Sequence, residues 1–321
     1  MRPASLLLLL QSVREQTRYP DEILVVDGST NQETERMLQA HSFQKLTYFA
    51  VPPEQRGLTK QRNYGVRKVN AAMEVVCFLD DDTVLEKDYF KELMHTFQNH
   101  PEVSGVGGVA SNENKWEPLL AGRKYPNKRY YLWEGFAYKE GQRNVVRNYL
   151  GLQSNLGPGR MPDFSHGRTC GFPLTGKTYD VDLLIGMSFA FRKYVMDAIQ
   201  FSSYFEGYGL YEDADFSLRA LAFGKNVINT KARLSHLHHP SGRPNSFNYG
   251  KMVVRNGWYV WRVKNPHATV NAQVKWHSIT LLLAFIRFSN TFTSVKAKEA
   301  FLESVGRLLG WWSLLFNPPK V

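Results

Sequence analysis

The sequence predicts an α/β protein in which helices flank a mixed, mostly parallel sheet. Two observations predict this class. Short apolar runs, such as residues 22–26 and 75–79, have the length of buried strands, and stretches with helical periodicity separate them. Hydrophobic residues make up 43% of the 321-residue chain and charged residues 21%, an ordinary globular composition. Strands that alternate with helices favour a sheet covered on both faces.

Local patterns predict each element of the first part of the chain. Residues 4–16 are rich in leucine and other good helix formers, so we expect a helix there. The apolar strand over 22–26 ends in a turn-forming Asp-Gly-Ser-Thr segment. Residues 33–41 have the spacing of an amphipathic helix, and residues 46–51 form a strand that two prolines close.

The alternation continues with a helix over 59–69, which follows a glycine. Residues 75–79 form a run of apolar residues that three aspartates follow, as expected for a buried strand that ends at one edge of a sheet. A helix over 87–98 and a strand over 103–109 come next. In sheets of this kind, ligands bind at the carboxyl ends of the strands.

Residues 110–180 break the alternation, because glycine, proline, asparagine, arginine and aromatic residues are frequent there. Loops of this length are rare in compact domains unless they bind something, so we expect a functional insertion; a poorly ordered insertion is the alternative. Regular elements return near residues 181–186 and 188–192, and we expect a helix over 194–199. A helix over 212–223 and a strand over 225–234 follow. The sequence therefore predicts an α/β domain over 1–245 and a helical region over 246–321.

Charge and composition restrict the partners and the compartment. The net charge of +11 attracts nucleic acid, anionic lipid or phosphorylated ligands, and a solvated basic surface is the alternative. No long block of lysine and arginine is present, so we expect no nucleic-acid partner. No apolar run approaches the roughly 20 residues of a membrane-spanning helix. The sequence shows no convincing signal peptide, and its two cysteines do not indicate a disulfide framework. We therefore expect a cytoplasmic protein.

Basic and aromatic residues are interleaved in the helical region over 246–321. Short amphipathic helices of this composition can lie in a membrane interface. Two interpretations stay open at this point: peripheral attachment to an anionic membrane surface on its inner face, and helices that simply cover the α/β domain.

Three consecutive carboxylates, Asp80, Asp81 and Asp82, follow the strand over 75–79. Two such charges about 4 Å apart repel by roughly 4 kcal/mol at an effective dielectric constant near 20. A divalent cation with oxygen ligands would offset this repulsion, and Asp80 and Asp82 point to the same side of an extended chain. Helix capping is the alternative, although one aspartate suffices for it. The triplet favours a metal or nucleotide site.

A second acidic group, Glu212 and Asp213, begins a predicted helix after a glycine-rich loop. A carboxylate held there can act as a general base, and helix capping with dipole complementarity is the alternative. Asp27 ends the strand over 22–26. It can accept hydrogen bonds from a nucleotide base or ribose, or form a turn hydrogen bond.

Three histidines, His236, His238 and His239, follow the strand over 225–234. An imidazole near a carboxylate edge can supply one nitrogen ligand to a metal, although a single histidine is more often a polar surface residue. Their spacing from the two cysteines does not form a structural zinc site.

Four blocks of sequence, in matching order over about residues 1–245, resemble the family 2 inverting glycosyltransferases. They are PDEILVVDGST at 20–30, GLTKQRNYG at 57–65, FLDDDT at 78–83 and YEDADFSLR at 211–219. Each block is weak alone, and the four together are a strong signal. The resemblance implies a GT-A fold, the nucleotide-diphospho-sugar transferase fold, with the C-terminal helices as an extension. It implies metal-dependent transfer of a sugar, with inversion, from a nucleotide-diphosphate sugar to a hydroxyl of a glycan, polysaccharide or lipid-linked acceptor.

The resemblance also implies which residues bind the nucleotide sugar. Asp27 would contact the base, and Arg62 and Arg56 would border the nucleotide. Asp80 and Asp81 would hold the ribose and the metal-bound diphosphate.

The same resemblance implies the metal site and the catalytic base. Asp82 would be the direct ligand of Mg²⁺ or Mn²⁺, with His236 as a second ligand and His238 as its runner-up. Asp213 would be the catalytic base, with Glu212 as its neighbour.

One departure from the family bears on the fold and on the alternatives. Members usually begin with an apolar strand before the helix over 4–16, and this first strand is not apparent here, so we expect a sheet without it. A catalytically decayed or truncated relative that binds nucleotide sugars is therefore one alternative. A nucleotidyltransferase is another, although it normally has a glycine-rich, basic phosphate loop near its start.

Overall fold

The computed structural model describes residues 2–168, 170–238 and 244–321. The chain divides into two compact units. Unit 1 consists of residues 1–114 and 174–241, and unit 2 consists of residues 115–173 and 242–321. Most of the aromatic-rich segment after residue 110 thus groups with the C-terminal helices.

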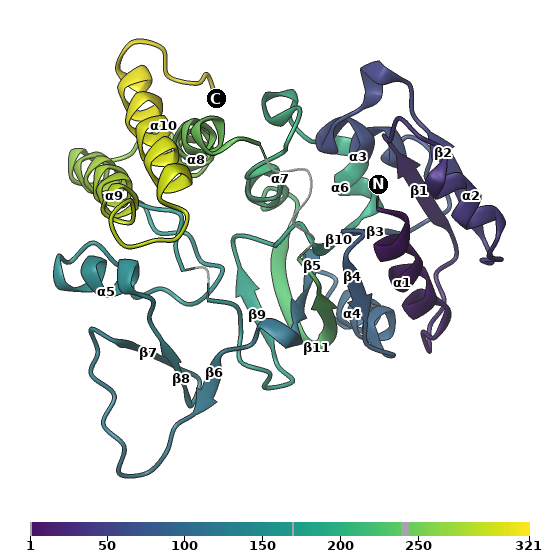
Figure 1. The fold of residues 1–321 in the computed structure, drawn as a ribbon. Coiled ribbons are helices and arrows are strands. Elements are labelled where there is room, and N and C mark those ends of the chain that lie inside the picture. Colours follow the sequence, from purple (N-terminus) through teal and green to yellow (C-terminus); the bar gives the residue numbers. More distant parts are fainter. Residues whose placement is uncertain (1, 169, 239–243) are drawn as a thin grey trace. The chain divides into compact units, whose positions relative to one another are not determined.

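Unit 1 begins with a helix and a small parallel sheet (Figure 1). The small sheet pairs β1 (Ile23–Asp27) with β2 (Leu46–Ala50). Helix α3 (Leu58–Val66) packs against β1, and α2 (Glu33–Gln39) connects the two strands. Leucines of α1 (Pro3–Arg14) pack into the main core of the unit. One side of this leucine-rich helix is therefore buried, as in an amphipathic helix.

The main sheet of unit 1 is mixed, as predicted. Five strands lie side by side in the order β3 (Val75–Leu79), β10 (Ser188–Arg192), β5 (Val103–Ala110), β11 (Lys225–His236) and β4 (Thr83–Leu85). A sixth strand, β9 (Thr178–Val181), also pairs with β11. Strands β5 and β11 are parallel, whereas β10 is antiparallel to both β3 and β5. Strands β4 and β9 are antiparallel to β11.

Parallel pairing does not predominate among the described strands. Strand β10 follows the long segment of unit 2, and an antiparallel strand needs no helical crossover to reach its neighbours. It therefore enters the sheet between β3 and β5 in the opposite direction.

Unit 1 also contains α4 (Tyr89–Asn99), α6 (Lys193–Ala198) and α7 (Glu212–Ala220). The core is aromatic where α7 meets the sheet. The rings of Phe191 and Phe216 lie 4.8 Å apart, and the rings of Phe201 and Phe216 lie 4.5 Å apart. These buried contacts fix the start of α7, which carries the acidic pair, relative to β10.

In its described residues, unit 2 combines a small antiparallel sheet with four helices. The sheet has the order β6 (Trp116–Pro118), β8 (Phe136–Lys139), β7 (Tyr130–Trp133). The helices are α5 (Gln142–Tyr149), α8 (Ser246–Lys264), α9 (Val270–Ser289) and α10 (Ala297–Phe316). None of the helices in the described ranges has the length and apolar character needed to cross a membrane.

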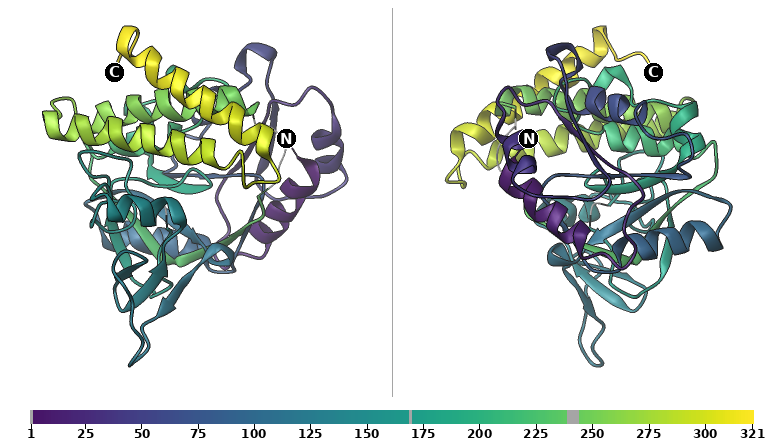
Figure 2. Two further views of the ribbon diagram at one scale, coloured as in Figure 1. Left: turned by 60° about the vertical axis from the view of Figure 1, so that its left-hand side comes forward. Right: turned by 90° about the vertical axis from the view of Figure 1, so that its right-hand side faces the viewer.

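Helices α8 and α10 approach each other closely through glycines. A Cβ atom at Gly250 would lie 2.2 Å from the carbonyl oxygen of Glu303, and one at Gly306 would lie 2.1 Å from the carbonyl oxygen of Phe247. Only glycine permits this backbone contact, so one side of α10 packs directly against α8. Helix α9 runs beside α10 (Figure 2).

Candidate active site

The aspartate triplet lies in the turn between β3 and β4, and backbone hydrogen bonds fix that turn. The amide of Asp80 donates to the carbonyl oxygen of Met187 at 3.0 Å, which ties the turn to the start of β10. The hydroxyl of Thr83 donates to the carbonyl oxygen of Asp80 at 2.8 Å. The carbonyl oxygen of Asp82 accepts from the amide of Leu237, just after β11, at 2.9 Å. The turn therefore connects β3 with β4 and is hydrogen-bonded to residues next to β10 and β11.

This arrangement brings Asp80, Asp82 and His236 together. One potential ligand atom from each lies within 4.8 Å of the others, and Nε2 of His236 is 3.4 Å from Oδ1 of Asp82. Asp82 and His236 are largely shielded from solvent. Carboxylate oxygens are the ligands that Mg²⁺ and Mn²⁺ prefer, and an imidazole can complete such a set. The donor chemistry and spacing of these residues fit a divalent cation.

Arg2 supplies part of the positive charge that the triplet requires. Its guanidinium forms an ion pair with Asp81, and its Nη1 lies 2.9 Å from Oδ2 of Asp82. The two oxygens of Asp82 thus face different partners, because Oδ2 meets Arg2 and Oδ1 faces His236. No local pattern around Arg2 indicates this contact, which joins residues about 80 positions apart.

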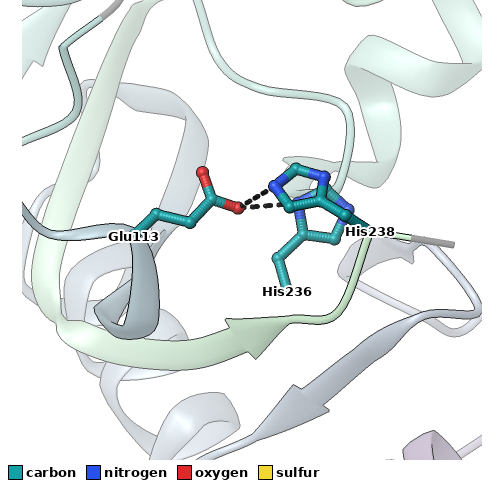
Figure 3. A group of neighbouring side chains, drawn as sticks. All are labelled: Glu113, His236 and His238. Atoms are coloured by element: carbon teal, nitrogen blue, oxygen red, sulfur yellow. Dashed lines mark hydrogen bonds and ion pairs between the residues drawn. The ribbon is translucent and has the colours of Figure 1, made fainter. Parts of the chain in front are cut away.

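Figure 3 shows how Glu113 holds two histidines. Its Oε1 lies 3.0 Å from Nδ1 of His236 and 2.6 Å from Nε2 of His238. A proton on Nδ1 of His236, donated to Glu113, leaves Nε2 as the nitrogen that faces Asp82. Metal-binding histidines are typically oriented by a carboxylate in this way.

Asn112 fixes the backbone of His236 in both directions. Its Oδ1 accepts from the His236 amide at 3.0 Å, and its Nδ2 donates to the His236 carbonyl oxygen at 2.9 Å. His238 contacts Glu113 and stands outside the group formed with Asp80 and Asp82. His239, the third histidine of this stretch, lies outside the described residues.

The acidic pair at the start of α7 divides into a buried and a more accessible carboxylate. Asp213 is half-buried, and its oxygens accept from the amides of Gly186 and Ala214, each at 2.8 Å. Gly186 permits this approach, because a Cβ atom there would lie 3.2 Å from Oε1 of Glu212 and 3.3 Å from Oδ2 of Asp213. Glu212 is only 6% exposed. Desolvation and the Asp213 charge raise the pKa of Glu212 to about 8, although Arg62 opposes the shift.

Arg62 connects the metal-type cluster, which consists of Asp80, Asp82 and His236, with the acidic pair Glu212 and Asp213. Its Nη1 lies 2.6 Å from Oε1 of Glu212, and its Nη2 lies 3.5 Å from Oδ1 of Asp80 and 3.1 Å from the carbonyl oxygen of Gly186. The guanidinium also lies 5.0 Å from the centre of the Phe189 ring, a cation–π distance. Although 37% of the Asp80 side chain is accessible, desolvation by the surrounding protein raises its pKa against the opposing charge of Arg62.

The structure places Asp27 in its own turn at the end of β1. Its Oδ1 accepts from the amide of Ser29 at 2.8 Å, and its Oδ2 accepts from the hydroxyl of Tyr48 at 3.1 Å. Burial would raise the pKa of Asp27, but hydrogen bonds from Ser29, Thr34 and Tyr48 outweigh it and lower the pKa.

Arg56 follows the short 3₁₀ turn Pro53–Gln55 and is half-buried. Its Nε is buried and has no hydrogen-bond partner among the residues that the structure describes. A buried donor of this kind carries a desolvation cost that an anionic ligand would offset.

The predicted site residues therefore fall into three groups. One edge of the main sheet brings together the two acidic clusters and their shared arginine, namely Asp80, Asp82, His236, Arg62, Glu212 and Asp213. Asp81 lies beside this edge through Arg2. Asp27 lies in its own turn at the end of β1, and Arg56 follows the turn Pro53–Gln55. The sequence did not single out Arg2, Asn112 or Glu113.

Residues 1–152 match the family model described as glycosyl transferase family 2. Two curated proteins are similar to part of the chain. The glucosyl-dolichyl phosphate glucuronosyltransferase of Haloferax volcanii is 28% identical over 126 residues, which are 38% of this chain and 38% of that protein. The O-antigen chain rhamnosyltransferase RfbN of Salmonella typhimurium is 29% identical over 112 residues, which are 35% of this chain and 34% of that protein. The match thus spans well under half of either relative.

A solved structure extends the likeness to nearly the whole chain. The mannosyltransferase PcManGT from Pyrobaculum calidifontis, in complex with GDP-Man and Mn²⁺, is similar with a TM-score of 0.52. The superposition covers 99% of this chain and 85% of that chain at 12% sequence identity. At this identity the likeness shows the fold alone, and it confirms the expected GT-A architecture.

Proposed function

We propose that this chain, whose residues 1–152 match the model of glycosyl transferase family 2, transfers a sugar with inversion. The donor is a nucleotide-diphosphate sugar and the acceptor carries a hydroxyl. The observation that carries the proposal is the arrangement at one sheet edge, where Arg62 contacts both Asp80 of the metal-type cluster and Glu212 beside Asp213. A site for the leaving diphosphate and a candidate base are thereby held by one side chain.

The metal-type cluster suits the leaving-group side of this reaction. Asp82 and His236, with Asp80, would hold Mg²⁺ or Mn²⁺, which would supply positive charge to the departing diphosphate. Glu113 and Asn112 hold His236 with Nε2 toward Asp82. Contacts within this chain therefore orient His236 as a potential metal ligand before any metal binds.

Asp213 is the proposed base, because it is the more accessible member of the acidic pair. The amides of Gly186 and Ala214 donate to its carboxylate and fix its position. In the proposed step, Asp213 takes the proton of the acceptor hydroxyl as the acceptor oxygen bonds to the anomeric carbon. The bond from that carbon to the diphosphate oxygen breaks on the opposite face, so the nucleoside diphosphate leaves and the configuration inverts.

The remaining predicted residues complete the donor side. Asp27 and Arg56 are proposed to contact the nucleotide, with the buried Nε of Arg56 as an available donor. Asp81, which forms an ion pair with Arg2, is proposed to lie near the ribose or diphosphate of the donor.

The acceptor is proposed to be lipid-linked, with a free glycan or polysaccharide as the alternative. The name of the Haloferax volcanii relative includes glucosyl-dolichyl phosphate, a lipid-linked sugar, which supports this choice. The proposed location is cytoplasmic, with peripheral attachment at the inner face of a membrane.

A donor screen tests the proposal. The full chain is incubated with Mn²⁺ and a set of nucleotide-diphosphate sugars, with and without acceptor candidates, and nucleoside diphosphate is quantified. Acceptor-dependent release, with an inverted anomeric centre by NMR, supports the proposal. Calorimetric binding of a nucleotide sugar without any release would favour a decayed relative, and formation of a nucleotide sugar from a nucleoside triphosphate would favour a nucleotidyltransferase.

A further inference from the structure

We propose that unit 2 docks on an anionic lipid bilayer through an exposed apolar face on α10 and the end of α9. This apolar face consists of Phe288 and Phe292 with six residues of α10, namely Phe301, Leu308, Leu309, Trp312, Leu315 and Phe316. The inference names the surface for the peripheral attachment proposed above. It stands on unit 2 alone and does not rest on the transfer chemistry of unit 1.

The six residues of α10 lie along one side of the helix and form a stripe. At 3.6 residues per turn they fall within an arc of roughly 120°. Their exposed fractions range from 44% for Phe301 to 74% for Phe316. The other side of α10 is occupied, since Gly306 and Gly310 lie against the backbone of α8 and Leu314 is buried. The stripe is therefore the side of α10 that packing within unit 2 leaves exposed.

Helix α9 extends this stripe at its carboxyl end. The rings of Phe288 and Phe301 lie 6.2 Å apart, and the rings of Phe288 and Phe292 lie 5.7 Å apart. Phe292, in the turn after α9, is 77% exposed. Figure 2 shows α9 and α10 side by side, and the two helices are in contact. Soluble monomers rarely expose so many large apolar side chains on one face.

The charge of unit 2 identifies the occupant. Unit 2 contains 21 lysines and arginines against six aspartates and glutamates, whereas unit 1 contains 19 against 23. Residues 246–321 alone contain ten against two. The net charge of +11 therefore comes from unit 2, and an anionic surface would attract this unit specifically.

The two acidic residues of α10 already have basic partners. Glu303 lies 2.8 Å from both Arg287 and Arg307, and Glu299 lies 3.6 Å from Lys296. Both acidic residues of the segment 246–321 are thereby paired, and its excess of basic residues, ten against two, remains. An apolar stripe beside basic residues is typical of helices that lie in the interface of an anionic bilayer.

A second copy of the chain fits this face less well than lipid does. A symmetric dimer would place two strongly basic units against each other, and the like charges would repel. Leucine side chains also offer nothing to the phosphates of a nucleic acid. An anionic bilayer satisfies both the apolar stripe and the basic charge.

Vesicle flotation of the full chain tests the inference. We expect flotation with phosphatidylcholine vesicles that contain about 30 mol% phosphatidylglycerol, and about tenfold weaker binding to phosphatidylcholine alone. The triple substitution Leu308→Ser, Leu315→Ser and Phe316→Ser should reduce binding by about tenfold or more. A matched control is Leu119→Ser, Leu120→Ser and Leu150→Ser, at exposed leucines of unit 2 outside the apolar face, which should bind as the parent chain does. Circular dichroism melting confirms that all variants fold.

Brominated lipids give a second readout, because they quench tryptophan fluorescence at bilayer depth. Quenching should occur in the parent chain and fall in Trp312→Phe, whereas Trp116→Phe, at a buried tryptophan, should leave it unchanged. A chain that stays in the soluble fraction with anionic vesicles overturns the inference. Undiminished vesicle binding by the triple variant also overturns it. So does light scattering that shows a dimer for the parent chain and a monomer for the triple variant. The lipid-free donor screen above succeeds or fails independently of these results.

Discussion

Arg62 and Glu212 form a buried ion pair in which Nη1 lies 2.6 Å from Oε1, and both side chains are less than 10% exposed. The pair joins α3 to the start of α7, 150 positions apart in the sequence. It therefore holds the start of α7, which carries Glu212 and Asp213, against α3. A buried pair of this kind need not add net stability, but breaking it leaves one charge without compensation.

At a pH above about 8, where Glu212 is ionised, substitution of Arg62 by Ala should destabilise the protein by about 3–5 kcal/mol, because the Glu212 carboxylate would remain buried without its partner. Denaturant unfolding measures this loss. The double variant with Glu212→Gln should recover part of it, since no buried carboxylate then remains. If the single and double variants are equally stable, Glu212 does not depend on Arg62.

Stability should depend on pH through Glu212. Its folded pKa, about 8, lies above its unfolded value near 4.5, so the folded state retains the proton longer. The parent chain should therefore lose stability relative to Glu212→Gln as the pH rises from about 4.5 to 8, and the difference should then level off. At about 1.4 kcal/mol per pKa unit, the difference reaches a few kcal/mol. Melting temperatures of both proteins across this range provide the measurement, and a difference that does not change with pH would contradict the raised pKa.

Substitution of Asp213 by Asn should reduce sugar transfer by about 10²–10⁴-fold, the usual contribution of a general base. Nucleotide-sugar binding, followed by calorimetry, should persist because Asn keeps the shape of the side chain. Asp197→Asn is the matched control, since Asp197 is an exposed aspartate of the same unit that pairs with Lys193. Full transfer by the Asp213 variant would remove Asp213 from the role of base.

Substitution of Glu113 by Ala should weaken Mn²⁺ binding by about 10–100-fold, because His236 loses the carboxylate that orients its ring. Electron paramagnetic resonance of free Mn²⁺ during a titration measures this without an activity assay. Glu113→Gln keeps an oxygen acceptor and should retain more of the affinity, and Glu102→Ala, at an exposed glutamate of the same unit, should retain all of it. The Asp82→Ala variant should bind least. Equal affinity of the Glu113→Ala variant and the parent chain would show that His236 does not need this carboxylate.

Removal of divalent cations should abolish transfer if Asp80, Asp82 and His236 hold the required metal. Chelation with EDTA followed by addition of Mg²⁺ or Mn²⁺ should restore the activity. Transfer that continues at full rate in EDTA would contradict metal dependence.

Local sequence predicted most elements of unit 1 because their patterns are short-range. The predicted strand over 75–79 coincides with β3, and the helix expected over 59–69 corresponds to α3 (Leu58–Val66). Strand β4 (Thr83–Leu85) was not predicted, since three residues after an acidic turn have no usable periodicity. It is a strand because β11 pairs with it.

The candidate site was predicted in part. The aspartate triplet, the acidic pair and His236 stand out in the sequence, because each follows or begins a recognisable element. Arg2, Asn112 and Glu113 carry no comparable signal. Their contacts with Asp82 and His236 span 80 to 124 positions, and only the folded sheet brings such residues together.

The sequence by itself determined the alternation of strands and helices, the family blocks and the carboxylates that carry the proposed chemistry. These depend on composition and spacing over a few turns or strand residues, which local physical preferences encode. Only the tertiary structure decided that β10 enters the sheet antiparallel, that Arg62 pairs with Glu212 and that Glu113 orients His236. It also decided which side of α10 stays exposed, because glycines of α8 and α10 assign the other side to helix packing. Each of these outcomes depends on contacts between distant segments, which no local pattern specifies.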